Sequence, residues 1–517
     1  MQLDLFIFPE FSTVMPVILP IAFAVLAAVL ASLTLLIAKK ETRRLPAIIA
    51  VIGFAVSLLY VYFLGLEVWA NDTATFVWSY AGETYSGPIG AVLAADKFSV
   101  VLMGLFTFMG LVVSLYSIGY MKEDNGLTQY YVLLMIMVGA MNGVVVSGDL
   151  FTLFVFYETM GICSFVLVAF RRNWEGIEAA IKYLMMSAIG STLILLSASY
   201  LYGLTGTLNL GAMATALSTS NDPLIPILAA IMTAGFGVKA AIIPFAAWLA
   251  DAHPAAPSGI SAMLSAVVIK VGVYGIIRMN VVLFSPVVVN WPLLLGIIAA
   301  VTMTAGNFYA LTQTDLKRML AYSSITQIGF ILFSFGTATV FGYQSGIFYI
   351  IIHALTKGLL FLCAGAFLHA IGSRDLDDLR GIGKKMPIVG AFFAIGILSL
   401  MGMPPLAGFF SKLLILLAGV QAGGYYLVFT IIAVSNALFA LGYYLRMLSA
   451  VWFSPVSKAA ENAHRPGISM LVAMGILALA LVVIGIYPGP VFNLAADAGT
   501  ALMNGDFITA ILSTLTP

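Results

Sequence analysis

Residues 234–278 read AGFGVKAAIIPFAAWLADAHPAAPSGISAMLSAVVIKVGVYGIIR, a largely apolar stretch that nevertheless contains Lys239, Pro244 and Lys270. A membrane-spanning helix needs about 20 apolar residues, so this stretch is long enough for two spans. Proline removes a backbone donor and clashes with the preceding turn, so Pro244 predicts an interrupted helix. A lysine near the middle of a spanning helix costs roughly 2.5–3.5 kcal/mol, which favours a functional role. The stretch therefore predicts a membrane helix that breaks beside a buried ionisable group.

The composition of the whole chain agrees with a membrane protein. Of 517 residues, 62% are hydrophobic and 9% are charged, against about 25% charged in soluble domains, and the mean hydropathy is +1.07. A net charge of +1 gives no basis for a nucleic-acid partner. Two cysteines, Cys163 and Cys363, are too few for a disulfide framework or a four-cysteine metal site. We therefore expect an all-α, polytopic protein in the lipid bilayer, with no cofactor and no metal.

Apolar runs long enough to span a bilayer number about fourteen. The first run lacks the basic segment of a signal peptide, so we expect it to be retained as a span. No connection between the runs is long enough for a soluble domain. The runs lie near residues 14–38, 45–66, 95–119, 127–147, 149–170, 179–203, 224–249, 257–280, 289–312, 319–337, 342–371, 387–418, 424–453 and 468–489.

Positive charge predicts the orientation. Lysine and arginine gather in the odd-numbered connections, such as KKETRR at 39–44 and SRDLDDLRGIGKK at 373–385, whereas the even-numbered side has only Lys97 and Arg278. Cytoplasmic loops of membrane proteins carry an excess of these residues. We therefore expect the odd-numbered connections in the cytoplasm, both termini outside, and the cell membrane as the location.

A second interruption predicts an internal repeat. Pro404 and Pro405 lie inside the twelfth run, as Pro244 lies inside the seventh. If spans 4–8 and 9–13 form two units, each interrupted helix is the fourth of five, and an odd number of spans per unit inverts the second unit. The expected division is N-terminal helices at 1–126, a first unit at 127–280, a second unit at 289–453, and a last helix with a tail at 468–517.

Ionisable residues inside the spans predict a proton relay. Desolvated lysines can lose their charge, and a neighbouring acid restores it, so a row of lysines beside one acid has protonation states that neighbours can switch. His353 lies four residues before Lys357, on the same helical face, and histidine titrates near neutral pH. The expected relay residues are Glu158, Lys239, Lys270 and Lys412, with His353, Lys357, His253 and Lys182 as secondary members.

Simpler roles stay open for three of these residues. Lys182 could extend to the cytoplasmic surface from the end of its span. His253, in DAHPAAP, could be a residue of a tight turn at the cytoplasmic side. Lys270 could be a structural partner of a backbone carbonyl.

Six segments within residues 96–446 resemble the antiporter-like subunits of respiratory complex I and its relatives. They read MNGVVVSGDLFTLFVFYETM, AAIKYLMMSAIGSTLILLSASYLYGLTGTLNL, GVKAAIIPFAAWLADAHPAAPSGISAML, TQTDLKRMLAYSSITQIGFIL, IIHALTKGLLFLCAGA and GMPPLAGFFSK. The resemblance implies fourteen spans with two inverted five-helix repeats, and ion movement along a polar axis at the membrane centre. It implies relay positions at Glu158, Lys239, Lys270 and Lys412, linked by His353 and Lys357. It also implies that the Glu158–Lys239 pair opens and closes.

Within that superfamily the chain is most similar to the D subunit of the multisubunit Mrp-type Na+/H+ antiporters. Lysine at 412 and the lack of a long lateral helix after the last span favour this type. The alternative is the ion-pumping subunit of a membrane-bound hydrogenase or of a complex I-like quinone oxidoreductase. The implied partners are other membrane subunits, and the implied cargo is the proton, with any Na+ handled elsewhere in the complex. No Fe–S ligand set, flavin fingerprint or haem pair is visible, so we expect no redox chemistry in this chain.

Two other kinds of function remain as rivals. If the chain were a membrane scaffold with structural lysines, the complex that contains it would transport normally after Lys239→Ala. A stand-alone transporter of a small organic substrate would be active without partner subunits and would need a polar pocket at the membrane midplane.

Overall fold

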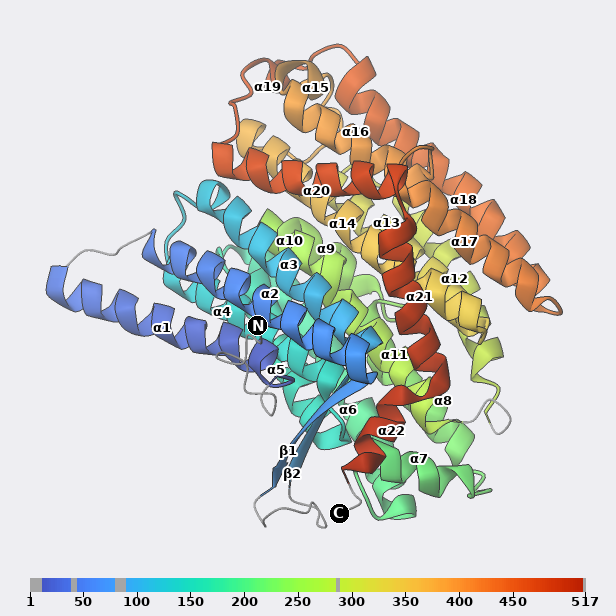
Figure 1. Ribbon diagram of the computed structural model, residues 1–517. Helices are drawn as coiled ribbons and strands as arrows, with labels where there is room; N and C mark the ends of the chain where they lie inside the picture. Colours follow the sequence, from blue (N-terminus) through green and yellow to red (C-terminus); the bar gives the residue numbers. More distant parts are fainter. Residues whose placement is uncertain (1–11, 39–43, 80–89, 285–288, 515–517) are drawn as a thin grey trace.

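The computed structural model describes residues 12–38, 44–79, 90–284 and 289–514 as a bundle of tilted helices with one β-hairpin at an end (Figure 1). Twelve of the described helices are long and apolar enough to cross a bilayer. If each of the two interrupted pairs of shorter helices crosses once, the total is the fourteen crossings that we expected. The all-α polytopic class is confirmed, and the number of crossings stays a prediction.

The N-terminal part contains an element that the sequence analysis did not predict. Strands β1 and β2 form an antiparallel hairpin in which Thr73 faces Asp96, where we expected an irregular connection. Its strands, TATFVWS and GAVLAAD, are short and lack a strict alternation of apolar and polar residues, so the sequence carries no clear strand signal. The elements are α1 (Met15–Ala38), α2 (Leu45–Asn71), β1 (Thr73–Ser79), β2 (Gly90–Asp96) and α3 (Lys97–Tyr120).

The next part of the chain contains the first interrupted helix. The elements are α4 (Leu127–Val146), α5 (Leu150–Val168), α6 (Trp174–Thr205), α7 (Leu210–Ser218), α8 (Ile225–Ala240), α9 (Ala247–Ala255), α10 (Ser258–Met263), the π-helical turn η2 (Leu264–Val268) and α11 (Ile269–Leu283). The break between α8 and α9 contains Pro244, as predicted. One expectation was wrong: most of DAHPAAP is not a turn, because His253 and Pro254 lie inside α9 and the bend is confined to Ala256 and Pro257.

The following part contains the second interrupted helix. Its break, between α16 and α17, contains Pro404 and Pro405, again as predicted. The elements are α12 (Trp291–Leu311), α13 (Leu316–Gly336), α14 (Val340–Ile371), α15 (Ile382–Lys385), α16 (Pro387–Met401), α17 (Ala407–Ala422), α18 (Tyr426–Leu448) and the π-helical turn η3 (Ser449–Phe453).

The C-terminal part is more ordered than the predicted tail. After α19 (Lys458–Glu461) and α20 (Ile468–Ile486), the chain forms α21 (Gly489–Asn504) and α22 (Asp506–Ser513). Helix α21 packs along α14 and α3, and α22 reaches α7 and the hairpin; Figure 1 shows this red segment crossing the bundle. The short apolar stripes of α21 and α22 were hidden by their glycines and polar residues.

The connections gather on two opposite faces. The hairpin face holds β1, β2, α7 and α22, and Leu93 of β2 bridges to Ser147 before α5. The arginine face holds the connections with Arg171, Arg318 and Arg374. There Arg171 pairs with Asp124, and Arg374 pairs with both Glu175 and Asp315, so four odd-numbered connections lie together. Residues 39–43 of the first basic connection, and residues 1–11 and 515–517 at the termini, lie outside the described part.

Two matching bridges support the predicted repeat. Asp149, which caps α5, pairs with Asn209 after α6, and Asp315, which caps α13, pairs with Asp375 after α14. Each residue of the second bridge lies 166 positions after its counterpart, since 315 follows 149 and 375 follows 209 by that number. The first bridge lies at the hairpin face and the second at the arginine face. This opposite placement is the one expected of inverted units, and the repeat itself stays a prediction.

A buried ion pair closes the hairpin end of the bundle. Arg278 of α11 donates to both oxygens of Asp96, at 2.8 Å each, and the ring of Phe507 from α22 lies 4.0 Å from its guanidinium. Burial alone would raise the pKa of Asp96, but the charge and hydrogen bonds of Arg278 and the N–H of Ser99 outweigh it, so this pKa lies below its usual value. The sequence analysis treated Arg278 only as a positive charge on the even-numbered side.

Candidate functional site

Glu158 and Lys239 lie on neighbouring helices without forming an ion pair in the described structure. Glu158 of α5 is half-buried and accepts a hydrogen bond from the hydroxyl of Ser191 on α6. The Nζ atom of Lys239 lies 3.4 Å from the carbonyl oxygen of Tyr157 and 4.2 Å from the centre of the Tyr157 ring. A Cβ at Gly161 would lie 2.6 Å from this Nζ, so a larger residue there would displace the end of the lysine side chain. The two residues therefore hold separate polar partners, as in an open state of the expected pair.

The first helix break places Lys239 at a helix end. Helix α8 stops at Ala240, and Ala241 adopts a left-handed conformation with φ of 55°. The indole of Trp248 on α9 donates to the carbonyl oxygen of Val238 at 2.9 Å, across the break. The last carbonyls of a helix carry a partial negative charge, which favours a cation in the final turn. The break thus supplies the ammonium of Lys239 with a favourable field inside the bundle.

Lys270 and Lys357 lie at the two ends of a hydrogen-bonded chain. Lys270 donates to the carbonyl oxygen of Ser265 at 2.5 Å. The hydroxyls of Ser265 and Ser324 are 2.7 Å apart, and Ser324 donates to the carbonyl oxygen of Leu320 at 2.9 Å. That carbonyl also accepts from Lys357 at 3.0 Å. The two helical segments, η2–α11 and α14, are therefore linked through α13, with the carbonyl and the hydroxyl of Ser265 serving as separate contact points.

The backbone of η2 explains part of this geometry. In a π-helical turn the regular i to i−4 ladder is displaced, and such turns are frequent at functional sites. The free carbonyl of Ser265 is the acceptor for Lys270, which agrees with the simpler role that we left open for this lysine. Both roles are compatible, because a carbonyl stabilises the ammonium without donating a proton to it.

His353 lies among three of the buried lysines. Neither of its ring nitrogens has a hydrogen-bond partner in the described residues, although the side chain is only 1% exposed. The charged groups near enough to act on it are Lys270, Lys357 and Lys412. An unpartnered buried polar group costs about 1–3 kcal/mol, so a role that requires free nitrogens is the simplest reason to keep one there. The expected link position is therefore surrounded by the groups it would connect.

Lys412 occupies the second helix break. It lies in the second turn of α17, and its Nζ is 2.5 Å from the carbonyl oxygen of Leu400 near the end of α16. Its ammonium also lies 5.6 Å from the ring of Phe330. As at Lys239, a buried lysine thus meets the end of a half-helix, where the backbone provides the negative potential.

Lys270, His353, Lys357 and Lys412 form a row of buried polar side chains, called the polar row below. Two further residues extend it toward the arginine face. Lys317 of α13 is buried and donates to the carbonyl oxygen of Ala256 at 2.8 Å. His253 is also buried, stacks on Phe361 with 4.4 Å between ring centres, and has no partner for either nitrogen in the described residues. Its charged neighbours are Lys317, Lys357 and Lys270. The sequence analysis missed Lys317 because it placed TDLKR in a loop.

A cavity of about 480 Å³ opens onto the arginine face beside Lys317. Its lining includes the backbone at Ala256, to which Lys317 donates, together with Arg171, Glu175, Asp315, Arg374 and Asp375. Lined by charged groups of both signs, such a cavity suits water. Ala256 lines the cavity and bonds to Lys317, so only one residue separates the cavity from the polar row.

Lys182 is an expected member that the structure places apart from this row. Its side chain is 49% exposed, and its Nζ pairs with Glu178 at 2.9 Å and with Asp251 at 3.0 Å. This position agrees with the simpler surface role left open for it.

The buried lysines lack acidic partners. Within the described residues no carboxylate lies within 4.0 Å of Lys239, Lys270, Lys317, Lys357 or Lys412. Each ionised lysine would cost roughly 2.5–3.5 kcal/mol at this depth, and like charges repel strongly where the dielectric constant is low. The five cannot all be charged together, so the row favours a partial and exchangeable set of protons. The described residues contain no cluster of three or more metal-ligating side chains, and both cysteines are free.

Fold and site together define a membrane-embedded subunit with a buried polar axis, and comparison with known proteins identifies its family. Residues 147–440 match the family described as NADH:quinone oxidoreductase/Mrp antiporter, TM, and residues 85–131 match the one described as NADH-Ubiquinone oxidoreductase (complex I), chain 5 N-terminus. The first match covers more than half of the chain and contains Glu158, all five buried lysines and both histidines of the row. The chain belongs to the NADH:quinone oxidoreductase/Mrp antiporter family.

Relatives come from more than one kind of complex. The chain is 32% identical over 426 residues to the N subunit of the F(420)H(2) dehydrogenase of Methanosarcina mazei, covering 80% of this chain and 85% of that protein. It is 29% identical over 498 residues to the D subunit of the Na(+)/H(+) antiporter of Bacillus subtilis, covering 96% and 99%.

Solved structures share the fold over nearly the full length. A chain of the membrane-bound sulfane sulfur reductase, an archaeal respiratory membrane complex, has a TM-score of 0.87 and 26% identity, with 98% of this chain and 99% of that chain covered. A chain of the Mrp complex from Dietzia sp. DQ12-45-1b has a TM-score of 0.85 at 23% identity, covering 97% and 100%, which concerns the fold alone.

Proposed function

We propose that this chain is the proton-translocating, antiporter-like subunit of a multisubunit membrane complex, most similar in role to the D subunit of an Mrp-type Na+/H+ antiporter. The observation that carries the proposal is the hydrogen-bonded chain from Lys270 to Lys357 in a core with no acidic partner for either among the described residues. A scaffold would have no reason to retain lysines there, given the cost of each. Relatives of the D type also match over almost the entire chain.

The proposed route has an inlet at the arginine face. Water in the 480 Å³ cavity exchanges protons with Lys317, and His253 passes them to Lys270 and Lys357. His353 connects this centre to Lys412 at the second break. Closing of the Glu158–Lys239 pair would withdraw positive charge from the centre, and opening would return it, which changes the affinity of Lys270 for a proton.

The test is formation of a pH gradient by the assembled complex in vesicles. Lys239→Ala should abolish most of the gradient, because the remaining lysines lose the group that switches them. Lys458→Ala, which removes an exposed lysine of α19, is the matched control and should leave the gradient intact. A normal gradient with Lys239→Ala in a fully assembled complex would refute the relay and favour the scaffold.

The second candidate is the ion-translocating subunit of a redox-driven complex. It is favoured by the 32% identity to the N subunits of two oxidoreductases, F(420)H(2) dehydrogenase and NADH-quinone oxidoreductase. Purification of the native complex decides between the two. Co-purifying small membrane subunits without flavin or Fe–S absorbance support the antiporter, whereas redox subunits support the second candidate.

The chain is a multi-pass membrane protein, and its solved structural neighbours are subunits of membrane complexes. We infer from the positive charges that the arginine face is cytoplasmic in the cell membrane. Ser373→Cys should then react with an impermeant thiol reagent only from the cytoplasmic side, since Cys163 and Cys363 are buried. We further infer that this subunit carries protons and that Na+ passes elsewhere, because lysines repel a cation. Sodium transport by the isolated chain would refute that inference.

A further inference from the structure

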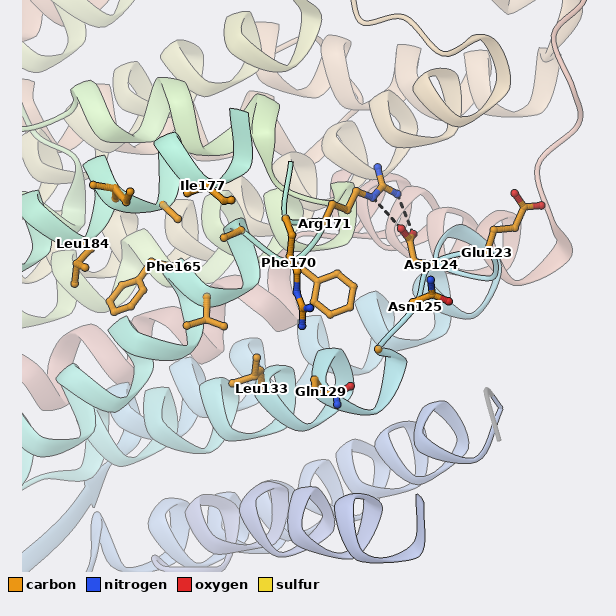
Figure 2. Close-up of a pocket in the computed structure, with 16 residues that line it drawn as sticks. Glu123, Asp124, Asn125, Gln129, Leu133, Phe165, Phe170, Arg171, Ile177 and Leu184 are labelled. Atoms are coloured by element: carbon orange, nitrogen blue, oxygen red, sulfur yellow. Dashed lines mark hydrogen bonds and ion pairs between the residues drawn. The ribbon is translucent and has the colours of Figure 1, made fainter. Parts of the chain in front are cut away.

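A groove of about 1060 Å³ lies at the edge of the arginine face, between the ends of α4, α5 and α6, and is not part of the polar row. Figure 2 shows its two halves. One half is an apolar wall formed by α4, α5 and α6, which are each long enough to span the bilayer. Ile177, Ile181 and Leu184 lie along one face of α6 in this wall. The wall consists of Leu133, Phe165, Val166, Ile177, Ile181 and Leu184.

The other half of the groove is a polar rim formed by the two adjoining connections. Arg171 at the rim is already committed, because its guanidinium donates to both oxygens of Asp124 at 3.2 and 3.1 Å. Figure 2 shows this pair, with Glu123 beyond it at the far end of the rim. Arg172, next in sequence, is exposed, and its side chain has no ion pair or hydrogen bond within the described residues. The exposed amide of Gln129 also lines the rim, on α4.

An uncommitted arginine above an apolar wall at the membrane edge fits one class of molecule. Arginine presents planar donors that match a phosphate group, and cations near the bilayer surface attract phospholipid headgroups. The apolar wall below it offers an acyl chain the same environment as the bilayer, but with a fixed surface. Exposed Trp174 at the start of α6 marks the interface level, where tryptophan is enriched.

We propose that this groove binds a glycerophospholipid, with the phosphate diester on Arg172 and one acyl chain along the apolar wall. The rim charges balance, since Arg171 neutralises Asp124 and Glu123 offsets Arg172. The site therefore selects for the phosphate and not for a net negative headgroup. This inference does not depend on proton translocation. A helix from a partner subunit is the rival occupant.

The test is native mass spectrometry of the purified, delipidated complex to which single lipids are returned. The probes are phosphatidylglycerol, phosphatidylethanolamine and diacylglycerol with identical chains. The two phospholipids should bind alike and more tightly than diacylglycerol. Arg172→Gln should weaken phospholipid binding by roughly fivefold, the effect of one cation near the surface, and remove the preference over diacylglycerol. Ile181→Trp, which fills the wall, should weaken all three lipids.

Arg465→Gln is the matched control, because Arg465 is exposed but lies outside the groove. It should bind as the unmodified complex does. Unchanged binding and preference in Arg172→Gln would overturn the proposal, as would a cross-link from Ile181→Cys to a partner subunit in the intact complex. Thermal unfolding of each variant shows whether a loss of lipid reflects the groove or a misfolded chain.

Discussion

A buried lysine with no carboxylate nearby depends on neutral oxygens and aromatic rings to hold its proton. Lys270, Lys357 and Lys412 each meet a backbone carbonyl. Such partners stabilise the ammonium less than an acid would, so the proton can leave without breaking a buried salt bridge. This weak hold is the property that a relay needs, and it distinguishes these lysines from Arg278, which is held by Asp96.

The hydroxyl of Ser324 is the group that connects the Lys270 end of the hydrogen-bonded chain to the Lys357 end. Ser324→Ala removes the hydroxyl that bonds to the hydroxyl of Ser265 and donates to the carbonyl oxygen of Leu320. One hydrogen bond is worth about 1 kcal/mol, so we expect proton transport to slow by about fivefold, measured as the initial rate of gradient formation. Ser334→Ala on the same helix, whose hydroxyl bonds to Gly342, is the control. Equal rates for both variants would argue against this path.

Lys182 provides a second test at the residue scale, because its two possible roles differ in outcome. Its ammonium is half exposed and shared by Glu178 and Asp251. Ion pairs at the surface are screened by solvent, so Lys182→Ala should alter thermal stability little and leave transport close to that of the unmodified complex. A strong loss of transport would return Lys182 to the relay.

Sequence reasoning reached most of the row because an ionisable residue inside an apolar run is costly and therefore visible. It missed Lys317, whose run begins with polar residues and resembles a loop, although the side chain turns inward to Ala256. It also could not assign partners. Whether Glu158 bonds Lys239 or Ser191 depends on a few ångströms between helices, which no sequence spacing determines.

At the scale of single elements, the two helix breaks are the places where the backbone itself takes part in the candidate site. Each break leaves backbone groups without their usual partners, and the structure assigns specific side chains to them. At the first break the indole of Trp248 donates to the carbonyl oxygen of Val238, and at the second the ammonium of Lys412 donates to that of Leu400. Prolines in the sequence predicted both breaks, whereas the π-helical turn η2 has no comparable signal and was not foreseen.

Trp248→Phe tests the first break. It preserves most of the buried ring but removes the indole N–H from the carbonyl of Val238, which then keeps only the backbone N–H of Ala241, so the protein should be destabilised by about 1 kcal/mol. Thermal unfolding of the purified complex measures the effect. Trp174→Phe is the control, since Trp174 is 79% exposed and should change little. An equal, small effect of both substitutions would show that the indole N–H is not needed.

At the scale of the whole molecule, the hairpin end is closed by groups from distant parts of the chain. Asp96 precedes α3, Arg278 lies in α11 and Phe507 in α22. Leaving one charge of a buried pair alone costs about 3–5 kcal/mol, so Asp96→Asn should lower the free energy of unfolding by that amount. Asp72→Asn, at an exposed pair with Lys97, is the control and should cost less than about 1 kcal/mol.

The pH dependence of this pair follows from the lowered pKa of Asp96. A carboxyl whose pKa is lower in the folded state stabilises the fold at every pH above its ordinary value of about 3.9. The contribution is lost only as the pH falls through the lowered pKa. The difference in unfolding midpoint between Asp96→Asn and the unmodified protein should therefore be constant from about pH 5 to about pH 8. A difference that shrinks within this range would contradict the assignment.

The two matching bridges bear on direction. If the two units form the predicted inverted repeat, the repeat itself favours neither direction of transport, and any preferred direction depends on residues that differ between the units. The bridge at the hairpin face joins the backbones of Asp149 and Asn209, whereas the bridge at the arginine face joins those of Asp315 and Asp375, so an amide at one position corresponds to an acid at the other. Arg374, which pairs with Asp315, adds a further charge at the arginine face. The predicted repeat would thus carry different charges at the corresponding positions of its two units.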